Sequence, residues 1–159
     1  MSASLCLADA DVLIDGAKYG LLQPLLRTHT IGVASTAFAE VKFYREANGE
    51  MHAIDLQPVV TAGTLTVVYG TAAELQSVYA RGVSTRLGVG ELEALSLVIS
   101  RALTFCTADQ LAVKTMLDLG CYERWIALEE LLACCTPPQT VPDPKYLRST
   151  VESRVRRTK

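Results

Sequence analysis

Residues 5–14 read LCLADADVLI, and this stretch decides the fold. Leu5–Ala8 is a short apolar run typical of a buried strand, and the aliphatic residues 12–14 begin a helical pattern. Asp9 and Asp11 lie between the two apolar runs, where desolvating a carboxylate is costly unless another group compensates. In extended geometry the two carboxylates share one side, whereas Asp11 as the N-cap of the helix is the alternative. We predict a buried strand followed by an acidic turn and a helix.

The same alternation of short apolar runs and helical patterns continues along the chain. Strands are expected at Leu5–Ala8, Ile31–Ala34, Leu65–Tyr69, Leu103–Cys106 and Trp125–Leu128. Apolar residues at helical spacing predict helices over 12–26, 36–47, 72–80, 90–101 and 109–119, with a short helix near 145–157. Short strands separated by helices predict an α/β fold in which a five-stranded parallel sheet lies between two helical layers.

Length and composition predict one folded domain in the cytoplasm. The chain has 159 residues, of which 50% are apolar and 20% charged, which excludes a disordered acidic protein. No apolar run approaches the roughly 18 residues that span a bilayer, and Met1–Leu7 lacks the basic start of a secretory signal. We therefore expect no membrane association. The five cysteines are odd in number and contain no C-x-x-C pair, which favours reduced thiols in the cytoplasm.

Charge divides the chain into two parts. Residues 1–140 carry nine basic and fifteen acidic side chains, whereas residues 141–159 carry six basic and two acidic ones. Such an acidic core argues against a binder of duplex DNA. We expect one core domain over 1–135 and a Pro-containing basic tail over 136–159. The tail either contacts phosphates or an acidic partner, or it is a solvated and disordered end.

Three further acidic positions lie at the starts or ends of expected elements. Glu40 borders the apolar stripe of the helix over 36–47 and has no basic partner one turn away. Glu91 follows two glycines in the first turn of its helix, where an acid also complements the helix dipole, and Glu93 is the reserve for this position. Asp109 follows the strand over 103–106 and is either a helix N-cap or a site residue. Thr107 supports a neighbouring carboxylate or a water.

These acids predict a site for divalent cations. In a parallel α/β sheet, ligands collect beyond the carboxyl ends of the strands, which brings such side chains together. Each pair of carboxylates 4 Å apart repels by roughly 4 kcal/mol at an effective dielectric constant near 20. Divalent ions neutralise such a cluster, and oxygen ligands favour Mg²⁺ or Mn²⁺ over zinc. Two such ions activate water for cleavage of a phosphodiester. The sequence therefore predicts a metal-dependent phosphodiester hydrolase.

The acidic motifs resemble those of the PIN domain of ribonucleases and toxin–antitoxin toxins. The resemblance covers about residues 4–130, in order and spacing. The stretch around Asp9 and Asp11 is similar to the opening motif of the family, and Ala39-Glu40-Val41 is similar to its second acidic motif. Residues 90–95, GELEAL, resemble the third motif, and Thr107-Ala108-Asp109 resembles the fourth. Asp11 departs from the neutral residue that is commoner in the family, and the basic tail lies outside the motif set.

The resemblance implies a sheet of strand order 3-2-1-4-5 and an endoribonuclease that cleaves single-stranded RNA by metal-activated water. It implies Asp9, Glu40, Glu91 and Asp109 as the catalytic residues and ligands of Mg²⁺ or Mn²⁺, with Asp11, Glu93 and Thr107 in support. It further implies a homodimer and the role of toxin in a toxin–antitoxin pair, inhibited by a cognate antitoxin protein. The alternative is a catalytically silent PIN-like module that binds RNA or protein.

Overall fold

A five-stranded, fully parallel sheet forms the centre of the computed structural model, which describes residues 4–83 and 86–157. Its strand order is β5-β2-β1-β6-β7. Counted without β3 and β4, which pair separately, this is the order 3-2-1-4-5. The strands are β1 (Cys6–Ala8), β2 (Ile31–Ala34), β5 (Leu65–Val68), β6 (Thr104–Cys106) and β7 (Trp125–Ile126).

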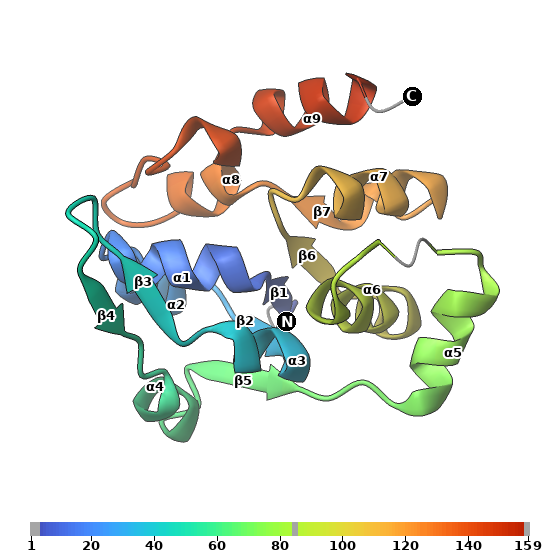
Figure 1. Ribbon diagram of the computed structural model, residues 1–159, viewed down its shortest axis with the longest axis horizontal. Helices are drawn as coiled ribbons and strands as arrows, with labels where there is room; N and C mark the ends of the chain where they lie inside the picture. Colours follow the sequence, from blue (N-terminus) through green and yellow to red (C-terminus); the bar gives the residue numbers. More distant parts are fainter. Residues whose placement is uncertain (1–3, 84–85, 158–159) are drawn as a thin grey trace.

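Helices lie on both sides of the sheet, so the predicted α/β class with a parallel sheet is confirmed. Figure 1 shows α1 and α6 on opposite sides of β1 and β6, and α9 outside α7 and α8, at the end of the molecule away from β5. The helices are α1 (Ala10–Lys18), α2 (Leu22–Thr28), α3 (Ser35–Glu40), α4 (Gln57–Thr61), α5 (Ala72–Ala80), α6 (Val89–Arg101), α7 (Gln110–Asp118), α8 (Leu128–Ala133) and α9 (Arg148–Arg157). Two short 3₁₀ helices are η1 (Tyr122–Arg124) and η2 (Pro144–Tyr146).

Three of the predicted boundaries were wrong. The expected helix over 12–26 is two helices, because Gly20 has a left-handed φ of 70° between α1 and α2. The expected helix over 36–47 ends at Glu40, and the chain then forms an antiparallel hairpin of β3 (Phe43–Arg45) and β4 (Met51–Ala53). The expected strand over 125–128 ends after two residues, and α8 follows it.

The core lies between the sheet and the helices that flank it. Leu7 on β1, Phe105 on β6 and Leu97 on α6 are fully buried. Trp125 is buried as well, and its indole N–H donates to the carbonyl of Thr107 at 2.9 Å, so it belongs to the core. This hydrogen bond fixes the backbone directly after β6, where the acidic residues begin.

The basic C-terminal region folds onto the domain, so the predicted alternative of a solvated end was wrong for residues 144–157. Tyr146, Val151 and Val155 are buried, and α9 packs against α7. We call residues 144–157 the C-terminal segment. No helix among the described residues is long and apolar enough to cross a membrane. All the cysteines are free thiols, at positions 6, 106, 121, 134 and 135.

Candidate functional site: an acidic pocket at the carboxyl end of the sheet

The site begins where β1 and β6 end side by side. Asp9 follows β1, and its backbone N–H donates to the carbonyl of Cys106, the last residue of β6, at 3.0 Å. The Asp9 carboxylate accepts from the N–H of Ala10 at 2.8 Å, so Asp9 is the N-cap of α1. Asp11 therefore lies within the first turn of α1. Both sequence expectations for it, extended geometry and the N-cap role, were wrong.

Thr107 connects the acids that follow the two strands. Its hydroxyl donates to the Asp9 carboxylate at 2.8 Å and accepts from the backbone N–H of Asp109 at 3.0 Å. The Asp109 carboxylate accepts from the N–H of Ala112 at 2.8 Å and caps α7. Thr107 thus has the supporting role predicted from its position, and it orients Asp9 through a buried hydrogen bond.

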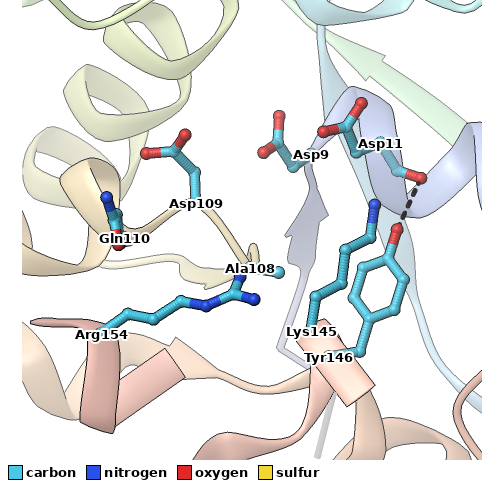
Figure 2. A pocket seen from close by; sticks show the side chains of 8 residues that line it. All are labelled: Asp9, Asp11, Ala108, Asp109, Gln110, Lys145, Tyr146 and Arg154. Carbon is cyan, nitrogen blue, oxygen red and sulfur yellow. Dashed lines mark hydrogen bonds between the residues drawn. The ribbon is translucent and has the colours of Figure 1, made fainter. Parts of the chain in front are cut away.

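Asp9 and Asp109 line a pocket of about 420 Å³. Figure 2 shows their carboxylates and that of Asp11 projecting to the same side, Asp9 and Asp11 from the start of α1 and Asp109 from the start of α7. Basic side chains from the C-terminal segment lie on the opposite wall. The lining is Asp9, Asp11, Ala108, Asp109, Gln110, Lys145, Tyr146 and Arg154.

Asp9 is the acid most perturbed by this environment. Only 8% of its surface is exposed. Burial raises its pKa from the ordinary value of 3.8 to about 7, the hydrogen bond from Thr107 opposes this shift, and the charges of Glu91 and Asp11 add to it. A carboxylate that is difficult to ionise at neutral pH gains from a nearby cation, because the cation offsets both desolvation and repulsion.

Glu91 links the remaining acids electrostatically. It lies in the first turn of α6, and its carboxylate accepts from the N–H of Gly88 at 2.6 Å. Partial burial raises its pKa, and the charges of Asp109, Glu40 and Asp11 raise it further. Glu40 is exposed at the end of α3 and joins the group through its charge. Within residues 4–83 and 86–157, no three acidic, histidine or cysteine side chains form a ready-made ligand set. Asp9, Asp11 and Asp109 line the pocket, whereas Glu91 and Glu40 are not among its lining residues and are connected to the group through their charges.

Glu93 has a different environment from Glu91. It is buried, and its carboxylate accepts from Ser35, from the backbone and hydroxyl of Thr36, and from the N–H of Gly70, all at 2.8–2.9 Å. Burial opposes ionisation, but these hydrogen bonds prevail and lower the pKa of Glu93. Glu93 therefore joins α6 to the start of α3 and the end of β5. Of the two glutamates, Glu91 interacts with the other acids.

Sequence reasoning missed the pocket residues on the C-terminal segment. Lys145 and Tyr146 follow Pro144, and Arg154 lies on α9, more than 40 positions after Asp109. The positive charge of the tail and the helix expected near 145–157 were the signals in the sequence, and neither indicated where the tail lies. The packing of Tyr146 against α1 decides this, since its hydroxyl donates to the carbonyl of Asp11 at 3.2 Å and to the Asp15 carboxylate.

Comparisons with known proteins add no assignment. No protein-family model matches this chain, and the search of curated proteins found no match. The resemblance to PIN domains thus depends on the motifs quoted above.

Proposed function

We propose that this chain is a divalent-metal-dependent endoribonuclease that cleaves single-stranded RNA, with Mg²⁺ or Mn²⁺ bound by Asp9, Glu40, Glu91 and Asp109. One observation carries the proposal. A buried carboxylate, Asp9, lies in a pocket with other acids at the carboxyl end of a parallel sheet, and its pKa is raised to about 7. Parallel α/β sheets place their ligands at this end.

The side chains present fit a hard divalent cation. The proposed donors are all carboxylate oxygens, which Mg²⁺ and Mn²⁺ prefer over the nitrogen and sulfur ligands typical of zinc. Burial raises the pKa of both Glu91 and Asp9, and the repulsion of neighbouring acids raises each of them further. When bound, such an ion activates a water molecule and stabilises negative charge on the leaving oxygen of a phosphodiester.

Hydrogen bonds within the chain restrict three of these donors, Asp9, Glu91 and Asp109, before an ion binds. Asp9 is fixed at one oxygen by the N–H of Ala10 and at the other by Thr107. The N–H of Gly88 fixes Glu91, and the N–H of Ala112 fixes Asp109. Each of these contacts restricts the rotation of a carboxylate. Less rotational freedom is then lost when an ion binds. Preorganised donors lower the entropic cost of forming the site.

The resemblance to PIN domains extends the proposal to the biological setting. We propose that the chain is the toxin of a toxin–antitoxin pair in the cytoplasm. In this proposal it acts as a homodimer and is inhibited by an antitoxin protein. The alternative is a silent module that binds RNA or protein. One observation favours it: Glu91 and Asp109 both have structural roles at helix starts. Capping alone accounts for an acid at each of these positions.

Cleavage of a labelled single-stranded RNA in millimolar Mn²⁺ separates the two functions. We expect cleavage by the wild type that EDTA abolishes and that Asp9→Asn reduces by at least about 100-fold, the lower range for loss of one essential acid–base or electrostatic group. The matched control is Asp118→Asn on the exposed end of α7, where the carboxylate pairs with Lys114 on its own helix. Metal-independent RNA binding without cleavage would support the silent module and refute the nuclease.

A further inference from the structure

The acidic pocket has a basic wall that the proposed metal site does not use. Lys145 of η2 and Arg154 of α9 line the pocket together with Asp9, Asp11 and Asp109. Figure 2 shows both basic side chains reaching into the space beneath the three carboxylates. The ammonium of Lys145 lies 3.3 Å from the Asp15 carboxylate, outside the group of proposed metal ligands. The pocket thus has one wall suited to cations and one suited to anions.

The basic wall is held in place by buried packing. Tyr146 is 1% exposed, and its hydroxyl donates to Asp15 on α1, which places the neighbouring Lys145. On α9, Val151 and Val155 are buried on the domain and determine which side of the helix faces the pocket. The wall therefore belongs to an ordered part of the fold.

Arg148 attaches the start of α9 to the domain through several contacts. Its guanidinium pairs with Glu130 of α8 at 2.6 Å and its backbone N–H donates to Glu129 at 2.6 Å, while its pair with Glu152 at 3.1 Å lies within α9. The same group lies over the ring of Trp125, with its central carbon 4.3 Å from the ring centroid. A planar guanidinium that forms ion pairs and stacks at once sets the position of the helix more firmly than a single ion pair does.

We propose that Lys145 and Arg154 bind a backbone phosphate of single-stranded RNA next to the acidic wall, so that the C-terminal segment is the phosphate-binding half of the site. This inference rests on the proposed nuclease function. The acidic wall alone repels a polyanion, and a single divalent ion does not neutralise four carboxylates, so positive charge on the facing wall favours the approach of a phosphate. An ammonium and a guanidinium on one wall provide that charge, and both bind phosphate oxygens well.

Arg156 offers a matched control on the same helix. It lies two positions after Arg154, and 100° per residue places the two side chains on nearly opposite sides of α9. Arg156 borders a separate cavity with Leu117 and Tyr122. Replacing Arg154 or Arg156 by alanine changes the net charge equally, so any difference between the variants reports position.

The test is the salt dependence of RNA binding. Binding is measured by the fluorescence anisotropy of a labelled single-stranded RNA in millimolar Mg²⁺. The parent chain carries Asp9→Asn so that the RNA stays intact. We expect Lys145→Ala and Arg154→Ala each to reduce the slope of log K against log salt by about 0.7, the value for one phosphate contact with a single strand. Arg156→Ala should leave the slope unchanged, and Arg154→Lys should retain most of it.

Two outcomes would overturn the inference: an equal loss of slope in Arg156→Ala, or slopes in Lys145→Ala and Arg154→Ala that match the parent. Absence of RNA binding by the parent at low salt would overturn it as well. Failure of the nuclease proposal gives a different result. If the variants show the expected slopes but the wild type does not cleave RNA, the nuclease proposal fails and the phosphate contacts stand. Thermal unfolding of each variant shows whether the wall itself is intact.

Discussion

Replacing Asp9 by Asn should change the pH dependence of stability in a defined way. In the fold, burial and neighbouring charges raise the pKa of Asp9 from 3.8 to about 7. Between these two values the folded state holds a proton that the unfolded chain releases. The contribution of Asp9 to the free energy of unfolding is therefore largest at low pH and declines as pH rises toward the folded pKa.

The size of this effect follows from the two pKa values. One pKa unit corresponds to 1.36 kcal/mol, so ionising Asp9 in the fold costs about 4 kcal/mol by pH 8. Asn cannot ionise and avoids that cost, although the hydrogen bond from Thr107 to its amide oxygen is weaker than the one to the carboxylate. We expect the difference in unfolding free energy between Asp9→Asn and the wild type to shift in favour of the variant by about 2–3 kcal/mol from pH 5 to pH 8.

Urea denaturation of both proteins in EDTA measures this difference, because every other titrating group is common to the pair and cancels. Millimolar Mn²⁺ should then stabilise the wild type at pH 8 more than the variant, since the ion binds the ionised carboxylate. A difference that stays constant between pH 5 and pH 8 would refute the reasoning, because it would mean that Asp9 is already ionised at pH 5 at no cost.

Three further substitutions test the surroundings of the site. Glu93→Gln should lower the free energy of unfolding in urea by about 2 kcal/mol, because an amide cannot accept all the hydrogen bonds of the carboxylate; reduced affinity for Mn²⁺ would instead identify Glu93 as a ligand. Gly90→Ala should lower the melting temperature despite a gain in helix propensity of up to about 1 kcal/mol, since the new Cβ would lie 3.1 Å from the Cβ of Ala37; a higher melting temperature would contradict the close packing of α3 and α6. Tyr146→Phe should cost about 1–2 kcal/mol in thermal unfolding and speed hydrogen exchange in α9, because Asp15 loses its buried donor; unchanged exchange would show that other contacts hold the segment.

Local sequence patterns were sufficient to predict the sheet and the acids that follow its strands. The apolar run over 5–8 ends at Asp9, and the run over 103–106 ends at Thr107 and Asp109, so each strand and its polar ending are read from adjacent residues. The α/β class follows from the alternation of such runs with helices. The same reasoning identified Thr107 as a support for a carboxylate, which the hydrogen bond to Asp9 confirms.

Contacts between distant residues determined what the sequence left open. Glu91 and Glu93 both lie near the start of α6, and only the approach of Ser35 and Gly70 shows that Glu93 is already occupied by hydrogen bonds. Residues 43–53 form a hairpin in which Gly49 has a left-handed φ of 86° and Tyr44 stacks on His52 with ring centroids 5.0 Å apart, and helical periodicity does not reveal this pairing.

The position of the C-terminal segment was hidden for the same reason. Its apolar side consists of Val151 and Val155, four positions apart in a strongly charged stretch, which is a faint pattern for a packed helix. The docking of Tyr146 against α1 involves residues more than 130 positions apart. Neither local propensity nor charge indicates such a contact, so the basic wall of the pocket emerged only from the fold.

Proton release on binding of Mn²⁺ tests the central claim most directly. Calorimetric titration of the wild type in two buffers of different ionisation enthalpy gives the number of protons displaced, since a carboxylate must lose its proton to bind the ion. With the pKa of Asp9 at about 7, we predict release of about one proton per site at pH 6 and close to none at pH 8, and no such release from Asp9→Asn. Binding of Mn²⁺ with the same proton release by Asp9→Asn, or no binding by the wild type, would contradict the account.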